Sequence, residues 1–83
     1  FKGYVFLDKE KKNSVKTLLG IAVFYNKMDL VRYFVENMKV DKNERVNDLG
    51  QTALILATIN NQKDIVDYLV AQNADANIRD NSG

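Results

Sequence analysis

Apolar residues recur at spacings of three and four in four short segments of the chain. In the first two segments they are Leu19, Ile21 and Ala22, then Leu30, Val31, Phe34 and Val35. In the other two they are Leu54, Leu56 and Ala57, then Ile65, Val66, Leu69 and Val70. Such spacing places the apolar side chains on one side of a helix. The pattern therefore predicts four helices, arranged as two helix–turn–helix pairs.

Polar residues stand where these helices should begin and end. Thr17 and Thr52 precede the first helix of each pair, where a hydroxyl can accept a hydrogen bond from an otherwise unpaired amide. Asn26, Asn61 and Asn73 stand where helices must end, and asparagine tolerates the left-handed backbone of such turns. The prediction is helix, tight turn, helix and polar loop, twice.

The two predicted pairs are copies of one another at an offset of 35 residues. The matched stretches are 17–22 with 52–57, 29–31 with 64–66, and 33–35 with 68–70. The register then slips, so that 40–43 pairs with 74–77 and 47–50 pairs with 80–83. Repetition at such a period is typical of stacked repeat proteins. We divide the chain into repeats at 17–46 and 47–79, with 80–83 starting a further one and 1–16 either an N-terminal cap or the remnant of a preceding repeat.

The second copy resembles the ankyrin-repeat family. The family unit opens with Asp-x-x-Gly-x-Thr-Pro-Leu-His-x-Ala and closes with Gly-Ala-Asp-Val-Asn. The corresponding stretches here are Asn47-Asp48-Leu49-Gly50-Gln51-Thr52-Ala53-Leu54-Ile55-Leu56-Ala57 and Asn73-Ala74-Asp75-Ala76-Asn77. The first copy diverges more, and its Gly20, inside a predicted helix, should cost roughly 0.5–1 kcal/mol relative to alanine. The resemblance implies an all-α fold, an ankyrin-repeat solenoid of stacked helix–turn–helix units with β-hairpin loops.

Catalysis and metal binding find little support in the composition. The chain has no His and no Cys, which removes the commonest general base and the thiol nucleophile. Asp64 and Asp67 lie one helical turn apart, as a pair of acid–base carboxylates might. The simpler interpretation is a solvated outer helix face with favourable negative charge near the helix N-terminus. The stretch 75–80 begins like a calcium loop, but Arg79 occupies a ligand position and the glycine of the turn is absent. We expect no enzyme activity, no metal and no cofactor.

The charge pattern favours a protein partner over nucleic acid or membrane. The formal net charge is +1, and the Lys-rich stretch 9–12 contains an acid, whereas nucleic-acid surfaces carry a clear basic excess. No segment approaches the ~20 apolar residues of a membrane-spanning helix, and the start of the chain has no signal-peptide pattern. About three repeats are normally needed to bury a continuous core, so the exposed repeat ends predict possible self-association.

The resemblance implies partner contacts at the loop tips and at the ends of the first helices. These positions are Phe24, Tyr25, Val46, Asp48, Leu49, Gln51, Ile59, Asn60, Arg79, Asn81 and Ser82. An alternative for Phe24 and Tyr25 is packing beneath the apolar stretch 4–7. The function predicted is a protein-interaction module or scaffold. The alternatives are a regulatory ankyrin segment of a larger enzyme or effector, and a structural spacer.

Overall fold

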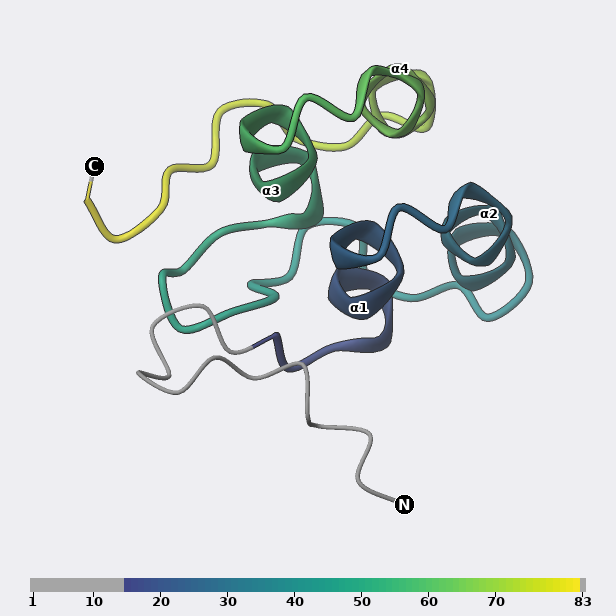
Figure 1. Cartoon of the computed structure of the whole chain (residues 1–83), viewed down its shortest axis with the longest axis horizontal. Coiled ribbons are helices and arrows are strands. Elements are labelled where there is room, and N and C mark those ends of the chain that lie inside the picture. The colour runs from purple at the N-terminus through teal and green to yellow at the C-terminus, as the bar shows by residue number, and fades with distance from the viewer. Residues whose placement is uncertain (1–14, 83) are drawn as a thin grey trace.

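The computed structural model describes residues 15–82 as two stacked helix pairs (Figure 1). The helices are α1 (Leu18–Phe24), α2 (Met28–Glu36), α3 (Ala53–Ile59) and α4 (Lys63–Ala71). They coincide with the four segments of helical periodicity. The all-α repeat fold is confirmed. The capping role predicted for residues 1–16 falls almost wholly outside the described residues.

Local sequence signals set the helix boundaries as predicted. The Thr17 hydroxyl accepts a hydrogen bond from the Gly20 amide at 2.9 Å, and the Thr52 hydroxyl accepts one from the Ile55 amide at 3.3 Å. Asn26, Asn61 and Asn73 have φ angles of 57°, 58° and 67°. These left-handed residues turn the chain sharply after α1, α3 and α4, which lets each helix pair fold back on itself.

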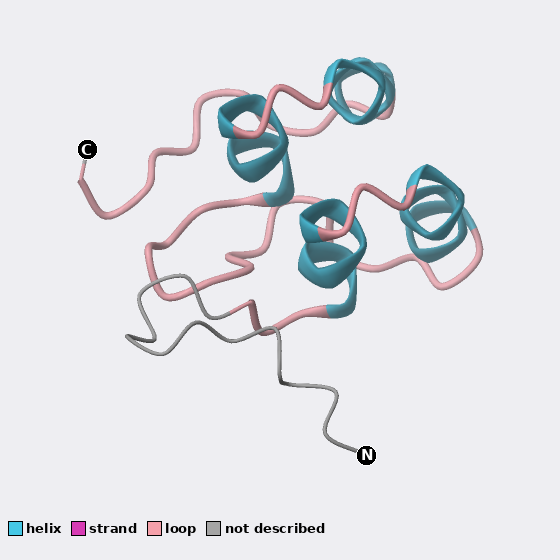
Figure 2. Cartoon of the chain, in the orientation of Figure 1, coloured by secondary structure: helices cyan, strands magenta, loops and turns pink. Residues whose placement is uncertain are grey.

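The helices form two layers. α1 packs against α3 and α2 packs against α4, while each pair is closed by contacts of α1 with α2 and α3 with α4 (Figure 2). Branched aliphatic side chains fill the space between them. The largest fully buried ones are Leu19, Val23, Val31, Val46, Ile65 and Leu69. Because the core is shared between the two repeats, neither pair buries its apolar side alone.

The loop between the repeats is a tight turn rather than a β-hairpin. The Val46 amide donates to the Gln51 carbonyl at 2.7 Å, and the only bridge assigned within residues 15–82 joins Val15 to Asn47. No strand forms in that range. The physical reason is the Asn47 side chain, whose carbonyl accepts from the Leu49 and Gln51 amides, both at 3.1 Å. These bonds take up amides that a longer ladder would need, so the expected β-hairpins are not seen here.

Polar bonds on the α2/α4 side also join the repeats. The Tyr68 hydroxyl donates to the Glu36 carboxylate at 2.5 Å, and the Arg32 guanidinium lies 5.5 Å from the centre of the Tyr68 ring. Burial raises the pKa of Tyr68 to about 12, the bond to Glu36 acts in the same direction, and the Arg32 charge opposes it. A neutral Tyr68 hydroxyl therefore remains a donor at physiological pH.

Candidate functional site

A hollow of about 240 Å³ lies where the inter-repeat loop meets the ends of α1 and α3; we call it the groove. Its lining residues are Val15, Phe24, Asn47, Leu49, Gln51, Leu56, Ile59 and Asn60. None of them is ionisable. The groove therefore has no acid, base or charged nucleophile, and what it offers a ligand is apolar contact and amide hydrogen bonds.

Repetition of the fold builds the apolar wall of the groove. Phe24 ends α1 and Ile59 ends α3, and the two occupy the same position in their repeats. Phe24 is 39% exposed and Ile59 is 57% exposed. The Phe24 ring meets the Tyr25 ring edge-on, with centroids 5.1 Å apart and an interplanar angle of 86°. Because the helix ends lie side by side, the stack displays two large apolar residues together with the half-buried Leu49.

The amide groups at the base of the groove are occupied by one another. The Asn47 side-chain amide donates to the Gln51 side-chain carbonyl at 2.8 Å, and only 6% of each residue is exposed. Asn60, by contrast, is exposed at the rim. Buried amides that are already paired hold the loop in shape and gain little from a ligand.

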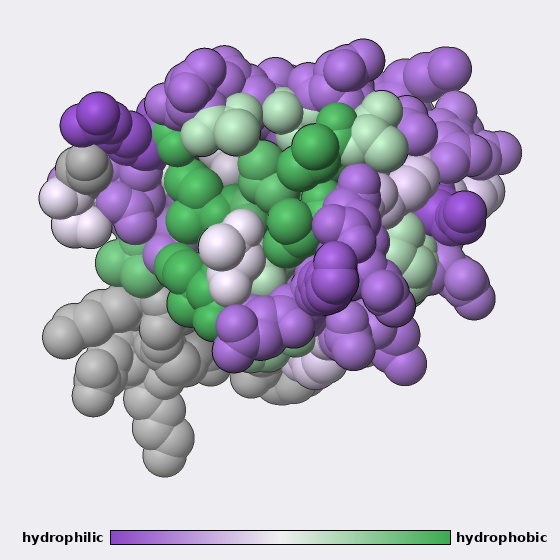
Figure 3. All heavy atoms as spheres, turned by 90° about the horizontal axis from the view of Figure 1, so that it is seen from above, coloured by the Kyte–Doolittle hydropathy of each residue, from purple (hydrophilic) through white to green (hydrophobic). Residues whose placement is uncertain are grey.

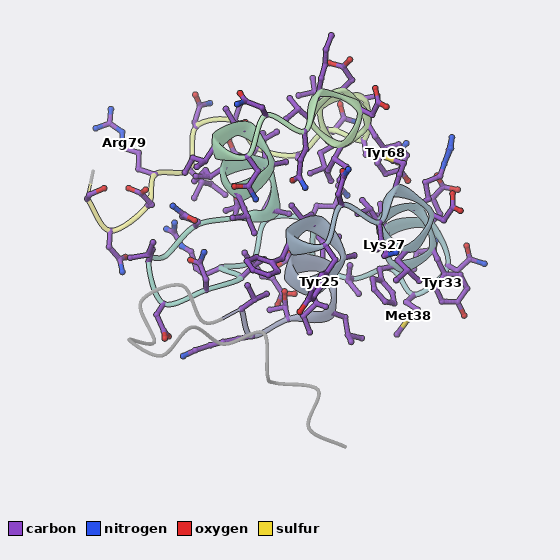
Figure 4. The ribbon with its side chains drawn as sticks, in the orientation of Figure 1. Tyr25, Lys27, Tyr33, Met38, Tyr68 and Arg79 are labelled. Carbon is purple, nitrogen blue, oxygen red and sulfur yellow. The ribbon has the colours of Figure 1, made fainter. Side chains whose placement is uncertain are left out.

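Charged side chains surround the groove without entering it. The Lys16 ammonium lies 2.5 Å from the Asp48 carboxylate. Arg45 donates to the Gly50 carbonyl at 2.7 Å and to the Arg79 carbonyl. Arg45 thereby joins the inter-repeat loop to the segment after α4. Figure 4 shows Arg79 pointing outward at the loop side of the molecule and Tyr25 at the end of α1.

Five of the predicted contact residues line the groove, and two of the eleven are buried. Phe24, Leu49, Gln51, Ile59 and Asn60 come together in the groove. Val46 has no exposed surface and belongs to the core, so its predicted role as a partner contact is wrong. The prediction that Gln51 contacts a partner is corrected as well, because Gln51 is buried and its side-chain carbonyl accepts a hydrogen bond from the Asn47 side-chain amide. In both cases the turn at 47–50 folds the flanking residues inward.

The remaining predicted residues lie beside the groove in the two loops. Asp48 is exposed and paired with Lys16. The Asn81 side chain donates to the Asp48 carbonyl at 3.1 Å, and the Asn81 amide donates to the Leu49 carbonyl at 2.9 Å. Ser82 bonds through its amide and its hydroxyl to the Asp80 carboxylate. Asn81 and Ser82 thus shape the second loop, and they remain exposed.

Three lining residues were not expected from the sequence. Val15 lies in a stretch that did not match the repeat, and Leu56 was assigned to the core, where it is 8% exposed. Asn47 had a usable signal, since Asn three residues before Gly is typical of a turn closed by its own side chain. The alternative that Phe24 and Tyr25 pack beneath stretch 4–7 lies outside the described residues.

Neither a metal cluster nor a spanning helix is found in the part of the chain that the structure describes. Residues 15–82 hold no group of three or more His, Cys, Asp or Glu side chains placed to bind an ion. None of the helices in this range is long and apolar enough to cross a bilayer.

Comparison with known proteins identifies one family. A family model described as ankyrin repeats, in three copies, matches residues 4–80, which is most of the chain. Searches of curated proteins and of solved structures found no match.

Proposed function

Because the chain belongs to the ankyrin-repeat family, we propose that it binds another protein through the groove and the loop tips beside it. Ankyrin repeats are generally non-catalytic protein–protein interaction modules. The observation that carries the proposal is the meeting of Phe24, Ile59 and Leu49, from three separate segments, around one hollow without ionisable residues.

The groove suits a large apolar side chain of the partner. A cavity of about 150 Å³ already holds a benzene-sized molecule, so 240 Å³ accommodates an aromatic or branched side chain. Anchors of that kind dominate interface energies when a polar rim excludes water around them. The polar rim here comprises Asn60, the Lys16–Asp48 ion pair and the exposed Arg79. We therefore place the anchoring contact in the groove and the orienting contacts on the loops.

The test compares groove variants with a surface variant of similar chemistry. Proteins captured by the wild-type chain are identified by mass spectrometry, and the affinity of a captured protein is then measured by calorimetry. Leu49→Ala and Phe24→Ala should weaken it by about tenfold or more, the range of interface anchors. Met38→Ala removes an apolar side chain that is 48% exposed and does not line the groove, so it should leave affinity unchanged.

Ile59 is a poor choice for this test because it also lines a second hollow on the other side of α3. Arg79→Ala and Tyr25→Ala report on the rim, where losses should be smaller than at Leu49. If the groove variants lower the melting temperature while affinity stays at the wild-type value, Leu49 and Phe24 serve the core and the proposal fails.

A further inference from the structure

The outer side of the second helix pair carries a larger apolar hollow, of about 390 Å³, which we call the α3/α4 end face. It is lined by Leu54, Ile55, Thr58, Ile59, Val66, Val70, Asp75 and Ala76. Figure 3 shows this face as a continuous apolar surface surrounded by hydrophilic residues. Val70 is 54% exposed there, which is costly for a side chain in an apolar cluster.

The first repeat shows what covers such a face. Val35 stands in α2 where Val70 stands in α4, and it is only 7% exposed. Val31, the counterpart of Val66, is fully buried. What buries them is the next helix pair, whose Ile65 and Leu69 also have no exposed surface and belong to the same core cluster. A helix pair with apolar residues at these positions therefore fits the α3/α4 end face.

The same chain presents such a helix pair at its other end. Leu30 is the counterpart of Ile65 and is 44% exposed, and Leu18 is the counterpart of Ala53 and is 49% exposed. Tyr33, the counterpart of Tyr68, is 51% exposed. Figure 4 shows Tyr33 on the side of α2 turned away from α4. Leu18, Leu30 and Tyr33 define the α1/α2 end face.

The distribution of charge selects between the possible orientations of two copies. Residues 15–46 contain six Lys or Arg and four Asp or Glu, a formal charge of +2. Residues 47–82 contain two Lys or Arg and five Asp or Glu, a formal charge of −3. Contact between unlike ends brings opposite charges together, whereas contact between like ends opposes equal charges. Unlike ends are favoured.

We propose that a second copy of this chain docks its α1/α2 end face on the α3/α4 end face, head to tail. Leu30 of the second copy then covers Val66 and Val70, in the way that Ile65 shares one buried core with Val31 and Val35 within one chain. Such an interface joins two different surfaces and leaves one of each unoccupied, so the assembly extends into an open chain of copies. The inference does not depend on the groove.

The first measurement is mass against concentration, by analytical ultracentrifugation. The wild-type weight-average mass should rise above 9.5 kDa as concentration increases, without settling at one stoichiometry. Val70→Glu and Leu30→Glu each block one end face and should remain at 9.5 kDa. An equimolar mixture of the two variants retains one intact pair of faces and should stop at twice that mass. Ala71→Glu adds the same charge one residue further along α4, outside the hollow, and should behave as wild type.

A second measurement is independent of whether the Glu variants fold. The chain has no cysteine, so Val70→Cys and Leu30→Cys each introduce a single thiol. Under mild oxidation the mixture should form the mixed disulfide dimer in excess over either symmetric dimer. Raised salt should reduce its yield, because screening weakens the attraction of the unlike ends.

Three results would overturn the proposal. A wild-type chain that stays at the monomer mass up to millimolar concentration shows that the end faces do not bind one another. Assembly that persists in Val70→Glu places the contact elsewhere. A predominant symmetric dimer of Val70→Cys shows contact between like ends, or a different partner surface.

Discussion

Gly20 illustrates how packing overrides helix propensity at a single residue. It lies in the first turn of α1, where alanine is the better helix former. A Cβ atom at this position would lie 2.7 Å from Val15 Cγ1 and 2.7 Å from Val46 Cβ. Both distances are well inside van der Waals contact. Glycine is required here because Val46 of the inter-repeat loop and Val15, which precedes α1, lie directly against the helix.

Gly20→Ala should therefore destabilise the fold. Overpacking of a close contact typically costs about 1–3 kcal/mol. That exceeds the roughly 0.5–1 kcal/mol that alanine gains in a helix. Urea unfolding followed by circular dichroism measures the difference. An increase in the free energy of unfolding would show that the loop yields and that helix propensity decides.

Residues whose conformation is set by near neighbours could be predicted from the sequence. The helix caps are formed by Thr17 and Thr52, and the left-handed turns by Asn26 and Asn61. These features depend on hydrogen bonds and backbone angles within a few residues, so the local sequence predicts them. The burial of Val46 could not be predicted in this way. It depends on the approach of Val15, on Gly20 and on the fold of a loop, which are contacts between segments distant in the sequence.

At the scale of elements, the segments that follow α2 and α4 contain the same turn, in which an Asp side chain accepts a hydrogen bond from the amide two residues later. The Asp41 carboxylate accepts from the Asn43 amide at 2.9 Å, and the Asp75 carboxylate accepts from the Asn77 amide at 2.8 Å. The Asn43 side chain in turn accepts from the Asp75 amide at 2.8 Å. Each loop is thus closed on itself, and the first loop is tied to the second.

Asp75→Ala should lower the free energy of unfolding by about 1 kcal/mol, the usual net value of a hydrogen bond. Asp75→Asn keeps a side-chain carbonyl that accepts from the Asn77 amide and should retain most of the stability. Chemical denaturation of both variants provides the comparison. A stable Asp75→Ala chain that has lost affinity for a captured protein would instead assign Asp75 to partner binding.

The element scale also separates what a pattern predicts from what it leaves open. Apolar periodicity located α1 to α4 because each helix buries one side. The β-hairpins implied by the resemblance did not appear within residues 15–82, since Asn47 bonds the amides of its own turn. The sequence predicted a set of exposed contact positions, and five of them line the groove. Phe24 and Ile59 follow from repetition, whereas Val15 joins them only through the three-dimensional path of the chain.

At the scale of the whole molecule, stability comes from the interface between the repeats. In stacked repeats each unit contacts only its neighbours, so the stability is a sum of unit and interface contributions. With two helix pairs there is a single complete interface within residues 15–82. Its centre includes Leu19, which is fully buried, whereas its counterpart Leu54 lines the α3/α4 end face and is 8% exposed.

This difference predicts unequal effects of the same substitution in the two repeats. Leu→Ala changes in cores cost about 2–5 kcal/mol, and the cost rises with the cavity that remains. Leu19→Ala leaves a cavity enclosed by both repeats and should fall near the upper end. Leu54→Ala opens onto the hollow of the end face, so it should fall near the lower end. A domain of this size has a total stability of roughly 4–12 kcal/mol, and either loss is a large share of it.

The measurement is urea unfolding at a concentration low enough to keep the chain monomeric, with Leu30→Ala as the control. Leu30 is 44% exposed in the single chain, so its truncation should cost much less than either core change. At high concentration the order changes if copies dock head to tail, because Leu30 then becomes buried and the hollow beside Leu54 is covered, so truncating either residue weakens assembly as well as the fold. Equal losses for Leu19→Ala and Leu54→Ala in the monomer would mean that the end face is already covered within the chain. The account of stability by a single inter-repeat interface would then be wrong.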